Sequence, residues 1–198
     1  MRLIRSWPKE IPEHRAYVED DAERFVMEDF SYEGLGAIDD DILLLEWDVA
    51  VSKEDLAYFA ATAARTPKDV LTTAYKLYFR GSKRLIWESR ADRGGGLWSC
   101  VRDPGTMRYE PVETGAPTCH LFGLGMIYLP RDLVRQHAEH AARFAKMRFT
   151  DADFSLWHMH MVKRETPICW DVRPIHLHYD VADLLPSEHD IKTWVATS

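Results

Sequence analysis

Cysteine is scarce in this sequence: three residues, Cys100, Cys119 and Cys169, occur among 198. Three widely separated cysteines cannot build the disulfide framework on which many small secreted domains depend. The first residues also lack the apolar core of a secretory signal peptide. These absences favour a reducing compartment, and we expect a cytoplasmic protein.

Long hydrophobic runs are missing as well. No segment approaches the roughly 18 consecutive apolar residues of a membrane-spanning helix, so we expect no membrane span. Positive charge is also in deficit, because 25 Lys and Arg residues face 32 Asp and Glu residues and leave a net charge of −7. Non-specific binding to nucleic acid needs a cationic surface, so this charge weighs against that function while leaving room for a local basic groove.

Repeats and low-complexity linkers, which would mark separate domains, are absent too. A chain of 198 residues is long enough to bury a substantial core. Its composition, 46% hydrophobic and 29% charged, is ordinary for a globular protein. We therefore expect one domain over residues 1–198.

Hydrophobic patterning predicts helices and strands in alternation. Residues 13–29 carry apolar side chains at helical spacing, which predicts an amphipathic helix. Residues 42–46 follow, with an unbroken apolar run over 42–45 that is typical of a strand buried on both faces. Ser52 and Asp55 then resemble the N-terminal cap of a helix that continues to about Thr66. Strand, short loop and helix in this order favour a parallel α/β arrangement.

The rest of the chain continues this alternation. A helix is expected from Pro130 to about Met147, and Thr150 with Asp153 opens another. Residues 102–118 carry Gly and Pro with little periodicity and are expected to form a long loop. Short strands are expected near residues 70–75, 84–87, 97–101, 168–172 and 175–181. The predicted fold is a single-domain, Rossmann-like mixed sheet flanked by helices.

Two carboxylates stand at the end of the most hydrophobic strand. The segment "DDDILLLEWDVAVS" places Glu46 and Asp48 one residue apart, directly after the apolar run. In open α/β sheets, ligands gather beyond the carboxyl ends of the strands. Carboxylate oxygens suit Mg²⁺ or Mn²⁺, ions that often also bind phosphate. The alternative is that both acids are simply solvated residues at a strand end.

Two histidine pairs occur at spacing i, i+2. On a strand, His176 and His178 point the same way, so both imidazoles can reach one metal. His158 and His160 fall in a predicted helix, where this spacing makes the side chains diverge, and we interpret that pair as structural. The first pair also has a structural alternative, because histidines in strands often simply pack.

Acids and glycines elsewhere suggest further parts of a site. Asp151 and Asp153 open a predicted helix, where they serve either as caps or, facing a cleft, as a general base. Gly123 and Gly125, in "FGLG", would let the backbone approach a ligand closely.

Taken in order, these motifs resemble those of small nucleotide-sugar glycosyltransferases of the GT-A type, over about residues 40–180. The resemblance implies that "ILLLEWD" holds the metal and the donor diphosphate, and that "FGLGMIYLPRDLV" lines the donor cleft. It implies that "FTDADFSLW" supplies the catalytic base and that "IHLHY" completes the metal site. The chain departs from the family in its short N-terminal half and in Glu46, which replaces the usual first aspartate of the acidic motif.

The resemblance predicts a metal-dependent glycosyltransferase that uses a nucleotide-diphosphate sugar. Asp48, assisted by Glu46, would hold Mn²⁺ or Mg²⁺, and His176 or His178 would complete the coordination. Asp153 or Asp151 would activate the acceptor hydroxyl, on a glycan, protein, lipid or modified nucleic acid. Two alternatives stay open: a histidine-rich hydrolase binding Zn²⁺ or Fe²⁺, and a non-catalytic relic of the fold that binds a sugar, a nucleotide or a partner protein.

Overall fold

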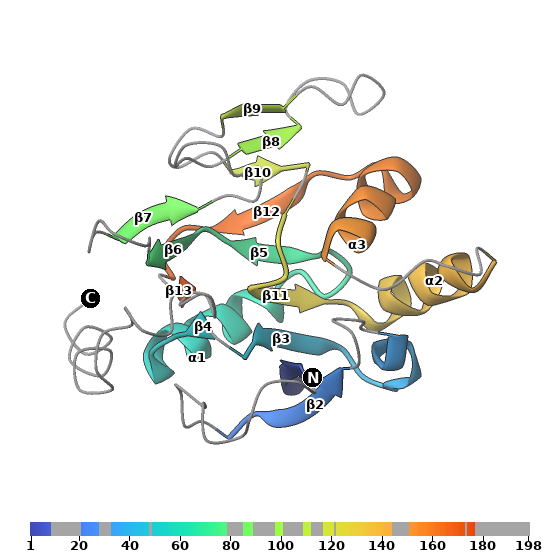
Figure 1. The fold of residues 1–198 in the computed structure, drawn as a ribbon, viewed down its shortest axis with the longest axis horizontal. Helices are drawn as coiled ribbons and strands as arrows, with labels where there is room; N and C mark the ends of the chain where they lie inside the picture. Colours follow the sequence, from blue (N-terminus) through green and yellow to red (C-terminus); the bar gives the residue numbers. More distant parts are fainter. Residues whose placement is uncertain are drawn as a thin grey trace.

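A mixed β-sheet with helices on both faces forms the centre of the computed structural model (Figure 1). The structure describes residues 1–8, 21–27, 33–47, 49–78, 85–88, 98–100, 109–111, 117–120, 122–143, 151–172 and 174–176. This architecture confirms the predicted Rossmann-like mixed sheet flanked by helices. Within the described part, no helix has the length and apolar character needed to cross a membrane.

The elements follow one another along the chain with short helices between strands. The strands are β1 (Arg2–Pro8), β2 (Glu23–Met27), β3 (Ile42–Glu46), β4 (Val49–Ala50), β5 (Leu71–Thr73), β6 (Tyr75–Tyr78), β7 (Leu85–Glu88), β8 (Trp98–Cys100), β9 (Tyr109–Pro111), β10 (Thr118–Cys119), β11 (Met126–Leu129), β12 (Thr166–Cys169) and β13 (Ile175–His176). The helices are the 3-10 helix η2 (Glu33–Ala37), α1 (Lys53–Ala63), α2 (Arg131–Ala142), α3 (Asp151–Trp157) and the π-helical turn η3 (His158–Val162).

Most strands of the main sheet run in one direction. The order is β10-β12-β5-β11-β3-β1-β2. β1 is parallel to β2 and β3, whereas β11 is antiparallel to both β3 and β5. Because β12 is parallel to β5, five strands point the same way and only β11 and β10 oppose them. The carboxyl ends of β1, β2 and β3 therefore meet at one edge of the sheet.

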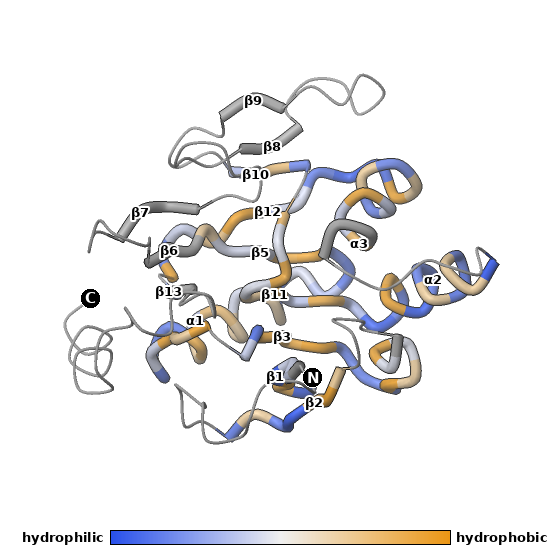
Figure 2. Tube along the Cα trace, viewed as in Figure 1, coloured by the Kyte–Doolittle hydropathy of each residue, from blue (hydrophilic) through white to orange (hydrophobic). Residues whose placement is uncertain are grey.

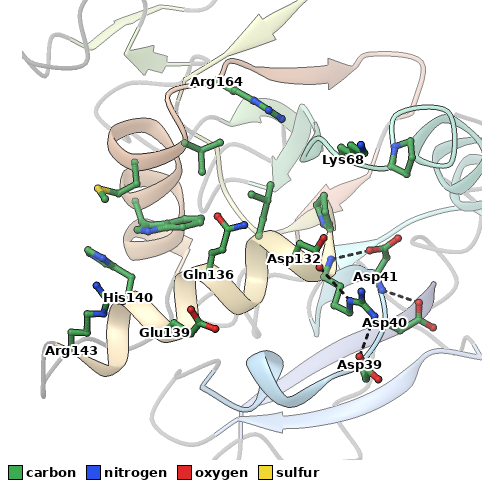
Figure 3. Close-up of a pocket in the computed structure, with 17 residues that line it drawn as sticks. Asp39, Asp40, Asp41, Lys68, Asp132, Gln136, Glu139, His140, Arg143 and Arg164 are labelled. Carbon is green, nitrogen blue, oxygen red and sulfur yellow. Dashed lines mark hydrogen bonds and ion pairs between the residues drawn. The ribbon is translucent and has the colours of Figure 1, made fainter.

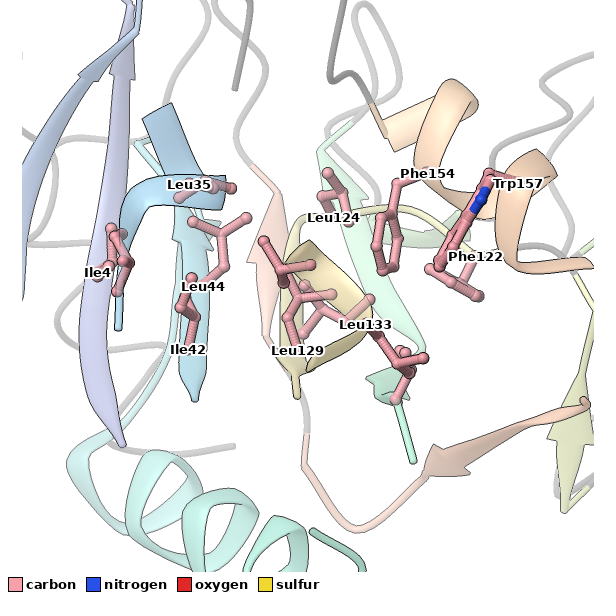
Figure 4. Close-up of a cluster of buried hydrophobic side chains, with 14 of the residues drawn as sticks. Ile4, Leu35, Ile42, Leu44, Phe122, Leu124, Leu129, Leu133, Phe154 and Trp157 are labelled. Carbon is pink, nitrogen blue, oxygen red and sulfur yellow. The ribbon is translucent and has the colours of Figure 1, made fainter. Parts of the chain in front are cut away.

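Strand β3 is buried on both faces, as its apolar run predicts. Ile42 and Leu44 belong to a cluster that packs under α2 and α3 (Figure 4). Leu43 and Leu45 point the other way, into a second cluster that includes Phe59 of α1. Figure 2 shows strongly hydrophobic residues along this strand. Side chains alternate across a strand, so a strand covered on both faces needs apolar residues at every position.

The helix starts follow the predicted caps in part. The Ser52 hydroxyl accepts a hydrogen bond from the Asp55 amide at 3.0 Å, which confirms the cap of α1, and the helix ends at Ala63, slightly before the predicted Thr66. α2 begins at Arg131, one residue after the predicted Pro130, and its end at Ala142 is earlier than predicted. Asp151 begins α3, as expected.

The prediction of a helix over residues 13–29 is wrong for the part of this segment that the structure describes. Residues 23–27 form β2, paired in parallel with β1, and residues 13–20 lie outside the described residues. Phe25 and Met27 turn inward while Arg24 and Val26 face solvent, which is the alternation of a strand. Pairing with β1 is a long-range interaction, and it outweighed the local helical spacing.

The loop predicted over residues 102–118 is also corrected, because it contains β9 and the first residue of β10. The strands expected near residues 70–75, 84–87 and 97–101 are confirmed as β5, β7 and β8. The two C-terminal strands are present as β12 and β13. β13 joins a separate four-stranded sheet in the order β4-β13-β6-β7.

Candidate functional site

The carboxyl edge of the parallel strands carries the predicted acidic motif. β3 ends at Glu46, and Trp47 follows it directly. Trp7 and Met27 occupy the corresponding ends of β1 and β2. In Figure 1, β3 points toward β4 and β13 and away from α2. This is the edge at which open α/β sheets bind their ligands.

A buried arginine holds the turn that follows β3. Arg5 of β1 is only 2% exposed. Its Nη1 donates hydrogen bonds to the carbonyl oxygens of Glu46, at 2.6 Å, and Val49, at 2.9 Å. These carbonyls stand on either side of Trp47 and Asp48, so one guanidinium fixes both ends of the acidic turn. A buried charge is tolerated only with such partners.

Sequence reasoning missed Arg5. The signal was present, since Arg5 follows the apolar Leu3 and Ile4 in the segment "RLIRSWP", and arginine is rarely buried in a strand. Its role depends on β1 pairing with β3, which places Arg5 opposite Leu45.

The glycine segment lies against the acidic motif. The Glu46 amide donates to the Gly125 carbonyl oxygen at 2.9 Å, and Gly123 and Gly125 are both buried. On its other side, the Phe122 amide donates to the buried Ser155 hydroxyl of α3 at 3.0 Å. Two hydrogen bonds thus connect the acidic motif, the glycine segment and the helix that opens with Asp151.

The C-terminal strand also reaches this edge. β13 pairs antiparallel with β4, and His176 is the register partner of Val49, the residue directly after Asp48. Residues far apart in the sequence therefore become neighbours along two backbones. Asp48 and His178 lie outside the described residues, and Asp151 and Asp153 are described only as the first turn of α3.

Two tryptophans pack at the same edge. The rings of Trp7 and Trp47 meet edge to face, with centroids 5.8 Å apart. Arg24 of β2 lies over the Trp7 ring at 4.5 Å, a cation–π contact. Both tryptophans are buried, so they give the acidic turn a rigid apolar support. The sequence did not indicate this pairing, because the two rings are joined only through the sheet.

The other histidine pair diverges, as expected from its helical spacing. His158 is buried, with its ring centroid 5.5 Å from that of Phe122 and 6.4 Å from that of Phe154. Burial lowers the pKa of its imidazole to about 4. His160, two residues later, is exposed. The two imidazoles therefore cannot share a metal ion without a rearrangement of this helix.

The described residues supply only part of a metal site. They contain no group of three or more His, Cys, Asp or Glu side chains placed to hold a metal ion. Of the predicted ligands, they include the half-buried Glu46 and the backbone of His176. A carboxylate at this position fits a hard cation in its chemistry.

A pocket of about 850 Å³ opens at the opposite edge of the sheet. It lies between α2, η3 and the segments that precede β3 and β5 (Figure 3). Asp41, which lines it, stands at the start of β3, whereas Glu46 stands at the strand's end. This pocket is therefore separate from the predicted acidic site.

Comparison with known proteins gives a likeness of fold. No family model matches the chain, and no curated protein matches it. Among solved structures, the crystal structure of A197 from STIV is similar, with a TM-score of 0.50 and 16% sequence identity. The match covers 89% of this chain and 85% of A197. At this identity the likeness concerns the fold alone.

Proposed function

We propose that this protein is a metal-dependent glycosyltransferase that moves a sugar from a nucleotide-diphosphate donor to an acceptor hydroxyl. One observation carries the proposal: the end of β3, the glycine segment and β13 converge at the carboxyl edge of the parallel strands. The Glu46–Gly125 hydrogen bond and the His176–Val49 register support it. These are the motifs that a donor site of this type needs side by side.

Each residue in the proposal has a chemical role. Asp48, with Glu46, would hold Mn²⁺ or Mg²⁺, and His176 or His178 would complete the coordination. The bound ion supplies positive charge that stabilises the departing diphosphate. Asp153 or Asp151 takes the proton from the acceptor hydroxyl, whose oxygen then bonds to the anomeric carbon as the sugar–phosphate bond breaks. Gly123 and Gly125 allow the donor to approach the backbone closely.

The histidine-rich hydrolase has less support. It requires the two histidine pairs to meet around one metal. His158 instead packs among Phe122 and Phe154, and His160 faces solvent. An imidazole in an aromatic cluster with a pKa near 4 is a packing residue.

Thermal unfolding with UDP-, GDP- and TDP-sugars, each with Mn²⁺ and with EDTA, tests the proposal. A ligand at 100 times its dissociation constant adds about 2.7 kcal/mol of stability. We expect one nucleotide class to stabilise the protein only with Mn²⁺, and slow release of nucleotide diphosphate in the same samples. Binding without release of nucleotide diphosphate would favour the alternative of a non-catalytic relic of the fold. No binding by any donor would overturn the proposal.

Asp48→Asn supplies the decisive variant, because it removes one charge from the metal site at nearly constant volume. We expect it to fold normally and to lose the Mn²⁺-dependent stabilisation. Asp21→Asn is the matched control, since Asp21 is exposed and precedes β2 at the opposite edge of the sheet. Equal Mn²⁺-dependent stabilisation in Asp48→Asn and the parent protein would contradict the assignment of Asp48.

A further inference from the structure

The pocket at the opposite edge has the form of a small-molecule site. Its volume of about 850 Å³ lies within the range of roughly 300–1,000 Å³ typical of ligand pockets. One wall is the face of α2 that carries Asp132, Gln136, His140 and Arg143, spaced by three or four residues. Trp157 and η3 line the pocket as well, and so do the segments before β3 and β5.

The floor of this pocket is apolar. Leu133 of α2 and Trp157 of α3 contribute buried side chains. Val162 lies beside them, and Met161 keeps 59% of its surface exposed. An exposed methionine at the rim of a buried tryptophan offers an adaptable apolar surface to a ligand.

Four of the five acids that line the pocket have partners within the protein. Asp39 pairs with Arg131 at 3.2 Å and with Arg135 at 2.7 Å. Asp40 pairs with the terminal amine of Met1 at 2.8 Å. Asp41 accepts hydrogen bonds from the Tyr128 hydroxyl and the Arg131 amide, both at 2.9 Å. Asp132 pairs with Arg131 at 3.5 Å.

Three cationic side chains of the pocket do not form ion pairs with its acids. Among the described residues, no ion pair or hydrogen bond engages the side chain of Lys68 or of Arg143. Arg164 forms an ion pair with the half-exposed Asp69, at 3.1 Å. This contact joins Arg164 to the loop that carries Lys68. Glu139 is the remaining acid that lines the pocket. The side chains of Lys68, Arg143 and Arg164 therefore make no ion pair with an acid that lines the pocket.

We propose that this pocket binds a small organic anion, in which a carboxylate, sulfonate or phosphate is attached to an apolar body. The anionic group pairs with Lys68 and Arg164 at one end or with Arg143 at the other, where Figure 3 places them. The apolar body lies over Trp157, Leu133 and Val162. This site is independent of the proposed transferase site, because it lies beyond the opposite ends of the same strands.

Fluorescence titration with 1-anilinonaphthalene-8-sulfonate tests the proposal, because this probe joins a sulfonate to an apolar body. N-phenyl-1-naphthylamine, which has the rings without the charge, is the matched probe. Both titrations are made on the full chain with EDTA present, so their outcome does not depend on the metal site. We expect one saturable equivalent of the sulfonate probe, displaced by phenyl phosphate or octanoate and not by inorganic phosphate alone.

Three variants distinguish the pocket from general surface binding. The double variant Lys68→Gln, Arg143→Gln should weaken the sulfonate probe about tenfold, the usual cost of a lost charged partner, and leave the uncharged probe unchanged. Gln136→Trp fills the centre of the pocket and should weaken both probes. The control is Lys53→Gln, Arg65→Gln, which removes the same charge from two exposed residues, one at the start of α1 and one just after its end.

The proposal fails if the sulfonate probe shows no saturable binding, or if Lys68→Gln, Arg143→Gln and the α1 control bind it equally well. It also fails if Gln136→Trp binds both probes as the parent does. All substituted residues are exposed, so unchanged thermal unfolding is expected and verifies that each variant is folded. Failure of the anion-pocket proposal would not affect the proposed metal-dependent binding of nucleotide sugars. Failure of the transferase proposal would likewise not affect the anion pocket.

Discussion

Arg5 shows how a single buried charge shapes the acidic turn. Its guanidinium donates to the carbonyl oxygens of both Glu46 and Val49, which lie on either side of Asp48. Both hydrogen bonds come from Nη1, so one nitrogen with two N–H donors, at the end of a long side chain, bridges these two positions from the neighbouring strand. The geometry of the turn therefore depends on a residue outside every motif that the sequence suggested.

Replacing Arg5 should loosen this turn and destabilise the fold. We expect Arg5→Met to lower the free energy of unfolding by about 2–4 kcal/mol, because two buried carbonyl groups lose a charged donor. Arg5→Lys should lower the free energy of unfolding by less, since lysine keeps a charged donor but lacks the planar guanidinium. Urea denaturation measures both changes. Arg65→Met, at an exposed position just after α1, is the control and should change stability by less than about 0.5 kcal/mol. An equally small change for Arg5→Met would contradict the stabilising role of the Arg5 hydrogen bonds.

His158 gives the protein a predictable response to acid. Burial among aromatic rings, with a smaller contribution from the charge of Arg164, lowers the pKa of its imidazole to about 4 from an ordinary value of 6.5. Between these pH values the unfolded chain takes up a proton that the folded chain does not. The free energy of unfolding should therefore fall by about 3 kcal/mol as the pH drops from 6.5 to 4, and the contribution should level off below 4.

Urea denaturation at several pH values measures this slope. In His158→Phe the titrating group is gone, so that part of the pH dependence should disappear. His160→Gln, at an exposed position, is the matched control and should keep the pH dependence of the parent protein. A parent slope that survives in His158→Phe would assign the effect to other groups.

At the scale of elements, β3 lies at the centre of the hydrophobic core. Leu44 is fully buried in the cluster beneath α2 and α3. We expect Leu44→Ala to cost about 2–5 kcal/mol of stability, the usual range for a buried leucine. Val26→Ala is the control on the outer strand β2, where the side chain is 60% exposed, and should cost less than about 1 kcal/mol. Similar costs for both variants, measured by chemical denaturation, would place β3 outside the core.

The sequence predicted those elements whose signals are local. The apolar run of residues 42–45 does not alternate, and this predicted a strand buried on both faces. Ser52 and Asp55 are three residues apart, so the cap of α1 was visible in the sequence. β2 was predicted as a helix because its strand character comes from pairing with β1. The cap of α2 was equally hidden, since Asp41, and not a neighbouring side chain, accepts the Arg131 amide.

At the scale of the whole molecule, the two edges of the sheet carry different chemistry. The motifs quoted from the sequence lead to the carboxyl edge, where Glu46, Gly125 and the backbone of His176 converge. The pocket at the other edge had no signal in the sequence. Its lining residues come from α2, η3 and two separate loops, and only the fold brings them together. Local patterns identify single motifs, while enclosed sites depend on long-range packing.

Asp41 joins the two faces of the molecule at the pocket edge. One carboxylate oxygen accepts the Arg131 amide at the start of α2, which packs on one face of the sheet. The other accepts the hydroxyl of Tyr128, whose ring belongs to the cluster on the opposite face with Phe59. The Tyr128 hydroxyl lies 3.1 Å from the Pro67 carbonyl oxygen as well, so its single proton is shared between two acceptors. Burial and the nearby Asp41 carboxylate raise the pKa of this hydroxyl well above its usual range, which keeps it a donor.

A double-mutant cycle of Asp41→Ala and Tyr128→Phe measures this link. Asp41→Ala should cost about 1–3 kcal/mol of stability, because α2 loses its cap and a buried hydroxyl loses an acceptor. Tyr128→Phe should cost about 1 kcal/mol, the net value of one hydrogen bond. Since both variants remove the same contact, the double variant should cost less than the sum by at least about 0.5 kcal/mol. The coupling stays below the full value of the bond, because in Asp41→Ala the hydroxyl can still donate to Pro67. Strict additivity in urea denaturation would mean that Asp41 stabilises α2 alone and does not connect the two faces of the sheet.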